Sequence, residues 1–346
     1  MHRLIASVLA VGCFTAIGSA QEKKSEPERL FRSRETLELT LKAPLKELFK
    51  NRDTLAVKPV NGTLEFKDAK AGDTSIPIVL ETRGHFRLKS STCSFAPLKV
   101  RFDKEKAKGT EFSGQGGLKL VTHCLNGTRY EQNLLLEESI YRIHNLLTPF
   151  SFRTRLAKIH YIPTDDTTKA VTRYGFFVEN DNEMAKRNQG TVLMQTGGKY
   201  EEMDQPLLDL MMIWEYFIGN TDWSVAMIHN FRVLAVEGKE NYYPVAYDFD
   251  FSGLVNASYA VPDYRLPIKS VKQRLYRGPC KKATELWPTI ELFRAKKDSM
   301  YAIIRTIPDF EPGRVKEAIG YLDDFFNDAK TAKDFDNSMG YACRGS

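Results

Sequence analysis

Three polar side chains in an otherwise apolar stretch have the types and the order that phosphoryl transfer requires. Asp222 follows an apolar helix-like segment, Asn230 comes eight positions later, and Asp248 follows a strand-like segment. In that chemistry an aspartate lies near the attacking hydroxyl, and an asparagine and a second aspartate hold magnesium. Asp250 is a second metal ligand or the alternative to Asp248. Hard carboxylate and amide oxygens favour Mg²⁺ or Mn²⁺ over zinc.

The sequence also contains candidates for a phosphate-binding cation and its carboxylate partner. Lys119 lies among apolar residues of a strand-like segment just before an amphipathic helix, so it faces either a cleft or solvent. Lys99 is the second candidate. Glu138 of the helix is the favoured partner of the lysine, and it shares a helix face with Glu131, seven positions earlier. Alternatively, these acids and Glu137 simply form a solvated helix face.

Each of these polar residues could also have a different role. Asp222 could cap a helical turn, and Asn230 could be a turn residue. A cluster of Asp222, His229 and Asp248 could instead serve a metal-dependent hydrolase. The sequence contains neither Gly-x-Ser-x-Gly nor His-Glu-x-x-His, so it lacks the local signatures of serine hydrolases and zinc proteases.

The elements that must position these residues divide the chain in two. Residues 35–180 alternate like strands around one helix at 130–147, and we expect a five-stranded sheet there. Residues 181–346 are mostly helical, with one strand pair at 231–236 and 242–247. This order, with a short extended connection between the parts, predicts an α+β, bilobal protein-kinase-like fold.

The individual elements follow from hydrophobic periodicity and turn residues. The expected strands of the first part are 37–41, 63–66, 76–88, 97–102, 117–122, 155–162 and 174–179, the last five of which form the sheet. The expected helices of the second part are 205–218, 286–295, 300–307 and 314–327.

Composition and the N-terminus indicate an exported globular protein. The chain has 346 residues, 42% of them hydrophobic, and its net charge of +6 is too small an excess to indicate nucleic-acid binding. Residues 1–20 have the pattern of a signal peptide cleaved near Ala20, and 21–34 form a charged linker. A lipoprotein anchored at Cys13 is the alternative. No later segment approaches the ~20 apolar residues of a transmembrane helix, so we expect a periplasmic or extracellular protein.

Removal of the signal peptide would leave four cysteines, Cys93, Cys124, Cys280 and Cys343. An even number in an exported chain favours disulfides, because no pair has Cys-x-x-Cys spacing. We predict Cys93–Cys124 and Cys280–Cys343, one in each lobe, from three possible connectivities. We expect a monomer.

Several short motifs, taken in order, resemble those of the spore coat protein H (CotH) kinase-like family. The resemblance covers about residues 75–255. The motifs are Glu-Thr-Arg-Gly at 81–84, Phe-Ala-Pro-Leu-Lys-Val-Arg-Phe-Asp at 95–103, Leu-Lys-Leu at 118–120, a helix ending in Tyr-x-x-x-Asn-x-Leu, Asn-x-Asp-Trp at 220–223 and Asp-x-Asp at 248–250.

The resemblance implies a secreted atypical protein kinase that uses ATP, a divalent metal and a Ser/Thr hydroxyl of a protein substrate. It makes Asp222 the catalytic aspartate and puts Asn230 and Asp248 on the metal. Arg83 of the first motif and Glu179 of the connection join the two lysines as candidate nucleotide-binding residues.

Two features depart from the usual kinase pattern. The spacing from the aspartate to the asparagine is eight, where kinase catalytic loops usually have about five, so residues 225–228 must bulge or form a helix out of the way. No Gly-x-Gly-x-x-Gly loop is present, and the nearest cluster is Gly114-Gln115-Gly116-Gly117. A non-catalytic, pseudokinase-type binding module of the cell envelope is therefore the alternative function.

Overall fold

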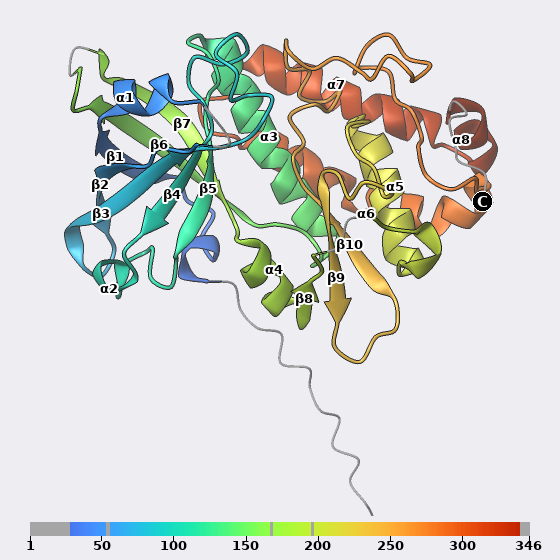
Figure 1. The fold of residues 1–346 in the computed structure, drawn as a ribbon. Helices are drawn as coiled ribbons and strands as arrows, with labels where there is room; N and C mark the ends of the chain where they lie inside the picture. Colours follow the sequence, from blue (N-terminus) through green and yellow to red (C-terminus); the bar gives the residue numbers. More distant parts are fainter. Residues whose placement is uncertain (1–27, 53–55, 167–168, 195–196, 340–346) are drawn as a thin grey trace, which may run out of the picture.

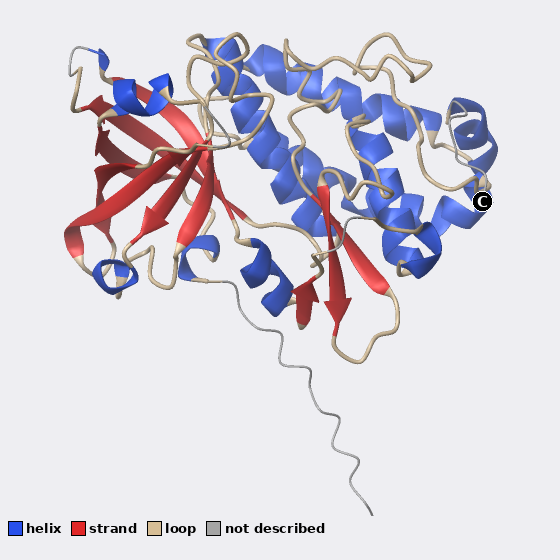
Figure 2. Cartoon of the chain, viewed as in Figure 1, coloured by secondary structure: helices blue, strands red, loops and turns tan. Residues whose placement is uncertain are grey.

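The computed structural model describes residues 28–52, 56–166, 169–194 and 197–339 (Figure 1). The chain is a mixed α+β protein, with a β-barrel on one side and a body of helices on the other (Figure 2). Among the described residues no helix has the length and apolarity to cross a membrane. The predicted signal peptide, residues 1–20, lies outside the described residues.

Seven strands of the described chain close into a barrel. Around the ring, every neighbouring pair is antiparallel except the first strand with the sixth, which is parallel. The strands are β1 (Leu37–Ala43), β2 (Val60–Asp68), β3 (Gly72–Thr82), β4 (Leu98–Phe102), β5 (Gly117–Val121), β6 (Thr154–Pro163) and β7 (Val171–Val178), in the ring order β1-β2-β3-β4-β5-β7-β6.

Apolar side chains that alternate along the strands fill the barrel. In β2, Leu64 and Phe66 are buried in the interior, whereas Lys67 is exposed. The short 3₁₀ helix η1 (Arg29–Phe31) adds its Leu30 and Phe31 to the same core, although the sequence predicts a charged linker here. The barrel core therefore begins before the predicted boundary at residue 35.

The expected five-stranded sheet is corrected to this closed barrel. Pairing of β1 with β6 gives partners to backbone groups that would otherwise form an exposed sheet edge. The strand expected over 76–88 ends at Thr82, because Gly84 has a positive φ of 91° and the chain turns into a loop.

The helices predicted for the second part are present, and most of their ends lie within a few residues of the predicted positions. One prediction is corrected. The segments 286–295 and 300–307 form a single helix, because the polar residues between them lie on its solvent side. The helices are α1 (Leu45–Lys50), α2 (Lys104–Ala107), α3 (Thr128–Leu147), α4 (Asp181–Arg187), η3 (Tyr200–Glu202), α5 (Gln205–Ile218), α6 (Ala283–Arg305), α7 (Pro312–Asp328) and α8 (Ala332–Ser338).

Helix α3 lies between the barrel and the other helices (Figure 1). Its apolar residues Leu136, Ile140 and Ile143 belong to a large core shared with α5, α6 and α7, and not to the barrel interior. Residues from the outer faces of β6 and β7, such as Leu156 and Phe176, complete this core. The helix expected to pack on the sheet therefore packs on the barrel and on the helices together.

A small sheet with the order β10-β9-β8 positions the polar loops of the second part. It consists of β8 (Gly190–Val192), β9 (Phe231–Val236) and β10 (Tyr242–Ala246). Strand β9 begins directly after Asn230, and β10 ends two residues before Asp248. The predicted strand pair is therefore present, and it fixes where both polar loops begin and end.

Candidate active site

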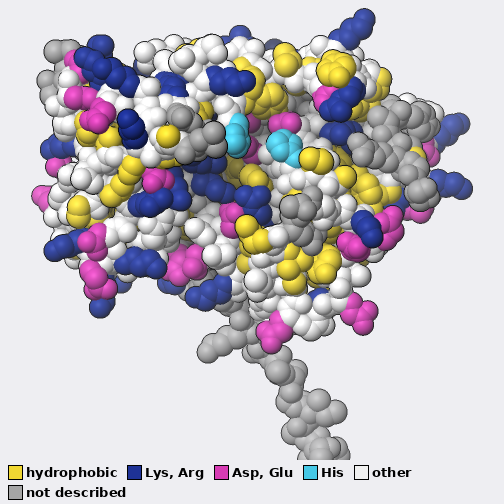
Figure 3. All heavy atoms as spheres, viewed as in Figure 1, with side chains coloured by type: hydrophobic (Ala, Val, Ile, Leu, Met, Phe, Trp, Pro, Cys, Tyr) yellow, Lys and Arg dark blue, Asp and Glu magenta, His cyan; other side chains and the backbone are white. Residues whose placement is uncertain are grey.

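Two cavities contain four of the nine candidate residues, Arg83, Lys99, Lys119 and Asp222. The first, of about 480 Å³, contains the predicted cations, and its described lining residues are Arg83, Lys99, Gly117, Leu118, Lys119, Asn180, Asp181, Asn182, Val192 and Met194. The second, of about 760 Å³, contains Asp222 and His229. On the face that Figure 3 shows, Lys and Arg side chains lie beside Asp, Glu and His side chains near the middle of the molecule.

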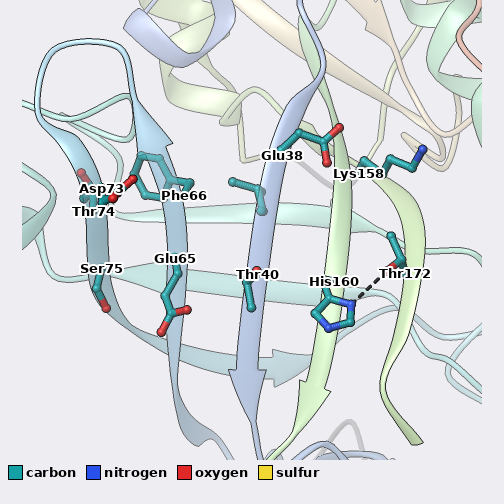
Figure 4. Close-up of a pocket in the computed structure, with 11 residues that line it drawn as sticks. Glu38, Thr40, Glu65, Phe66, Asp73, Thr74, Ser75, Lys158, His160 and Thr172 are labelled. Carbon is teal, nitrogen blue, oxygen red and sulfur yellow. Dashed lines mark hydrogen bonds between the residues drawn. The ribbon is translucent and has the colours of Figure 1, made fainter.

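A third groove, of about 580 Å³, lies on the outer face of the barrel (Figure 4). Most of its described lining residues are polar, and His160 Nδ1 lies 2.9 Å from Thr172 Oγ1 across β6 and β7. The described residues that line it include none of the candidate site residues. The chemistry predicted from the sequence therefore does not belong to this groove.

Lys119 faces the first cavity. Its neighbours Leu118 and Leu120 point into the barrel, so alternation along β5 turns Lys119 outward. Its Nζ lies 2.9 Å from Oδ1 of Asp181, the first residue of α4, and Arg232 Nε donates to the other oxygen at 2.7 Å. Burial lowers the pKa of Lys119, and the charge of Asp181 opposes this shift.

Glu138 is not the partner of this lysine. It is buried, accepts a hydrogen bond from Thr154 Oγ1 at 2.8 Å and lies 3.9 Å from Arg142. Glu131 does share this face, and it accepts from the backbone N–H of Tyr174. The face common to both acids therefore packs on β6 and β7, and the expected pair with Lys119 does not form.

Lys99 and Arg83 add two further cations to the first cavity. Lys99 lies opposite Lys119 in the register of β4 and β5, so both side chains leave the barrel on the same side. Neither Lys99 nor Arg83 forms an ion pair with any described carboxylate. Cations without carboxylate partners around one cavity favour the binding of an anion with several negative charges.

Asp222 lies in a loop that a glycine and an asparagine shape. Helix α5 ends at Gly219, whose φ of 70° is the left-handed conformation typical of a helix C-terminus. Asn220 Oδ1 then accepts the backbone N–H of Asp222 at 3.0 Å. The Asp222 carboxylate caps no described helix, and it accepts from His229 Nε2 at 3.1 Å and Asn230 Nδ2 at 3.0 Å.

The long spacing between Asp222 and Asn230 is absorbed by a bulged turn, one of the two forms expected from the sequence. Ser224 and His229 exchange backbone hydrogen bonds of 3.2 and 3.0 Å and so close the base of this turn. Met227 projects from the turn and is 74% exposed. The structure therefore brings Asp222 and Asn230 together despite the eight-residue spacing.

The two aspartates after β10 have different surroundings. Asp250 is buried, accepts from Tyr259 Oη at 2.8 Å and lies 3.9 Å from Arg87 Nη1. Burial and the nearby charge of Asp248 raise the pKa of Asp250 to about 7. Asp248 is only half-buried, and its carboxylate has no hydrogen-bond partner among the described residues.

Glu137 joins this acidic cluster. Burial raises its pKa well above the ordinary value, and the charge of Asp250 adds to the effect. Arg87 and Arg83 act in the opposite direction. The sequence pattern favours its neighbour Glu138, but Glu137 is the acid of α3 that faces the candidate site.

A divalent ion would find only part of its ligand set in these side chains. Within the described ranges, no three His, Cys, Asp or Glu side chains are grouped so as to hold a metal. Mg²⁺ is commonly bound through one or two carboxylates, with phosphate oxygens and water as its other ligands. Asp248 and the amide oxygen of Asn230, whose Nδ2 is engaged by Asp222, suit such an ion.

Glu179, a predicted nucleotide-binding residue, takes part in a buried ion pair. It is 1% exposed, and its carboxylate oxygens lie 3.1 Å from Arg187 Nε and 2.9 Å from Nη2. It also accepts the backbone N–H of Arg153. Glu179 is not among the described residues that line the first cavity, whereas the next three residues are.

One predicted disulfide is confirmed. Cys93 and Cys124 are bonded, 31 positions apart in sequence, and they join the loop after β3 to the segment after β5. This loop also provides Arg87, which donates to the carbonyl of Thr122. The second predicted pair includes Cys343, which lies outside the described residues.

Glu215 leads to a prediction about pH. It is 1% exposed on α5, and burial raises its pKa to about 8, with a further contribution from the charge of Asp222. The pKa of this carboxyl is near 4.5 in the unfolded chain and higher in the folded protein. Its contribution to stability is therefore fully present below the unfolded pKa and is lost as pH rises through the folded pKa. Stability should therefore fall between these two values.

Relative to Glu215→Gln, we expect the free energy of unfolding of the wild type to fall by about 2 kcal/mol between about pH 5 and pH 7. The glutamine keeps the shape of the protonated acid and does not titrate. Urea unfolding of both proteins at both pH values measures the difference. Equal changes in the two proteins would show that Glu215 does not have a raised pKa.

Comparison with known proteins does not identify the family of this chain. No known protein family and no curated protein matches the sequence. Among solved structures, the chain is similar to the Helicobacter pylori proinflammatory kinase CtkA, with a TM-score of 0.40 and 11% sequence identity. The match covers 69% of this chain and 93% of that one. At this TM-score and identity, the likeness establishes neither the family nor the function of the chain.

Proposed function

We propose that this protein is an exported atypical kinase of the CotH-like type, with a bilobal kinase-like fold. It transfers the γ-phosphate of ATP to a Ser or Thr hydroxyl of a protein, in a step that depends on Mg²⁺ or Mn²⁺. The observation that carries the proposal is the placement of two opposite groups of charges. Among the described residues, Arg83 and Lys99 have no carboxylate partner in the first cavity, and Asp248 has an unengaged carboxylate near Asp222 and His229.

The two groups of charges are close enough to affect one another. Burial lowers the pKa of Lys119 and raises that of Glu137, and the charge of Arg83 adds to the first shift and opposes the second. Glu137 in turn is affected by the charge of Asp248, and the pKa of His229 is raised by its hydrogen bond to Asp222, with a smaller contribution from the charge of Asp248. These mutual effects on the pKa values are those expected if the two groups of charges belong to one site, with a cationic side for phosphates and an acidic side for metal and acceptor.

Each group then has a role in transfer. Lys99, Lys119 and Arg83 bind the triphosphate, and Asp248 with Asn230 binds the metal ion. The ion, when bound, neutralises charge on the phosphate oxygens. Binding of the charged nucleotide therefore depends on residues from both the barrel and the helical body.

The transfer itself involves Asp222. The acceptor oxygen forms a bond to the γ-phosphorus, while the bond from that phosphorus to the β–γ bridging oxygen breaks and its electrons leave with ADP. Asp222 accepts the hydroxyl proton. His229 and Asn230, which donate to its two carboxylate oxygens, fix its orientation.

Thermal unfolding of residues 21–346 with ATP and Mn²⁺ tests the nucleotide site. A ligand at ~100 times its dissociation constant should stabilise the wild type by about 2.7 kcal/mol. Asp248→Ala and the double variant Arg83→Met/Lys99→Met should lose most of this stabilisation. Lys67→Met removes an exposed barrel cation away from the cavity and should keep it. A nucleotide effect that survives in all the variants would place the site elsewhere.

The non-catalytic binding module is the second candidate. One observation favours it: Lys119 is already held by Asp181, so it must exchange or share that partner to reach a phosphate. Such a module would bind ATP in the unfolding experiment and transfer no phosphate to any acceptor. The metal-dependent hydrolase would cleave a phosphate ester without ATP.

A further inference from the structure

Exposed large apolar side chains gather at the candidate site. In the described ranges they are Val57, Phe86, Met194, Met227, Val261 and Tyr264. Met194 lines the first cavity, and Met227 and Val261 line the second. Of this set, Val57 alone has no connection with either cavity.

Phe86 and Tyr264 belong to the same surface. The Phe86 ring packs on that of Phe251, which lines the second cavity, at 5.3 Å between centroids. Tyr264 is 93% exposed and lies between Asp263 and Arg265, two further lining residues. Single exposed apolar residues are common, but a group around one cavity is typical of a surface that binds another molecule.

The charged groups of the second cavity are already engaged with neighbours. Arg265 Nε donates to Asp263 at 2.9 Å. Arg277 donates to the Trp223 carbonyl at 2.8 Å and lies over the Trp223 ring. Asp222 is hydrogen-bonded to His229. The described walls of this cavity therefore combine exposed apolar side chains with polar and charged groups that already have hydrogen-bond partners.

The two exposed apolar residues that line this cavity come from segments far apart in sequence. Met227 is in the bulged turn, and Val261, which is 68% exposed, is in the stretch that follows Asp250. A small polar acceptor such as a sugar would need several converging hydrogen-bonding groups and would gain nothing from these side chains. A peptide with apolar side chains would remove them from water.

We propose that the second cavity selects a polypeptide acceptor in which bulky apolar residues flank the Ser or Thr, with Met227 and Val261 as the residues that determine this specificity. The inference rests on the proposed kinase function and adds the acceptor sequence to it. Met suits such a role because its flexible side chain adapts to different apolar partners. Recognition is apolar, so it depends little on ionic strength.

The test compares two sets of peptides. In one set Leu, Met or Phe flanks a single Ser, and in the other Gln replaces these residues. We expect the wild type to show a KM about tenfold lower for the apolar set. Met227→Lys and Val261→Lys should each raise that KM about tenfold, whereas Val57→Lys, at an exposed apolar residue that lines neither cavity, should not. Raising the salt from about 0.1 M to about 1 M should change the KM less than about twofold.

A binding assay separates failure of this inference from failure of the kinase proposal. The same peptides with Ala in place of Ser need no turnover, and fluorescence anisotropy measures their binding. Preferential binding of the apolar set that Met227→Lys weakens supports the inference even if no phosphate is transferred. Equal binding of both sets, or no binding of either, overturns it. Transfer without apolar preference would leave the kinase proposal intact and also overturn the inference.

Discussion

Replacing Asp222 with Ala is expected to lower the turnover of phosphate transfer by about 10³-fold, because the acceptor hydroxyl loses the group that takes its proton. Asp222 is partly exposed and lines the second cavity, and two neighbouring side chains hold its carboxylate. The fold should change little. Nucleotide affinity should stay near that of the wild type, because the cations proposed to bind phosphate line the other cavity. Single-turnover transfer from labelled ATP measures the effect.

Asp73→Ala is the matched control for this variant. Asp73 is an exposed aspartate in the groove on the outer face of the barrel, so its loss removes a carboxylate without touching the candidate site. We expect turnover within about twofold of the wild type, as is usual for surface changes. Comparable turnover in Asp222→Ala and the wild type would remove Asp222 from the mechanism.

Replacing Glu179 with Ala is expected to destabilise the protein by about 3–5 kcal/mol, because it leaves the buried Arg187 without its anion. The two side chains are 1% and 7% exposed, and two hydrogen bonds join them. Arg187 also donates to the carbonyls of Pro149 and Ser151, so the pair ties α4 to the segment before β6. Urea unfolding measures the loss.

The double variant Glu179→Leu/Arg187→Leu shows whether the loss comes from an unpaired charge. It should cost less than either single change to Ala, because no buried charge is left alone. Nucleotide affinity of the folded Glu179→Ala protein should equal that of the wild type. A large fall in affinity with little loss of stability would instead support the nucleotide-binding role that the sequence predicts for Glu179.

Local patterns predict the individual elements well. Helix α5 has the predicted ends because Asp204 caps its N-terminus, with Oδ1 accepting the N–H of Leu207, and Gly219 ends it. Strands β9 and β10 also lie where their local sequence pattern predicts them. Closure of the barrel is different, because the pairing of β1 with β6 joins segments more than a hundred residues apart. No local pattern specifies such a pairing.

The candidate site could be predicted where it depends on single residues next to recognisable elements. Lys119 and Lys99 face one cavity because strand alternation orients them, and Asp222 and Asn230 meet at the base of one turn. The partner of Lys119 could not be predicted, because Asp181 is 62 positions away and looks like an ordinary acidic residue in a first helical turn.

Arg232 and Arg87 could not be found from the sequence for the same reason. Arg232 lies in β9 and reaches Asp181 over 51 positions, and Arg87 lies in an irregular loop and faces Asp250. The choice between Glu137 and Glu138 depends on a rotation of about 100° along one helix. The apolar pattern of α3 does not fix this rotation, because the helix packs on two bodies and is buried on most sides.

The most direct test of the account is mass-spectrometric detection of phosphoserine or phosphothreonine after residues 21–346 are incubated with ATP, Mn²⁺ and the apolar-flanked Ser peptides. We predict phosphorylated peptide with the wild type, and almost none with Asp222→Ala or when Mn²⁺ is chelated. Wild-type protein that binds ATP and the peptides and still forms no phosphopeptide would contradict phosphoryl transfer and leave a binding module.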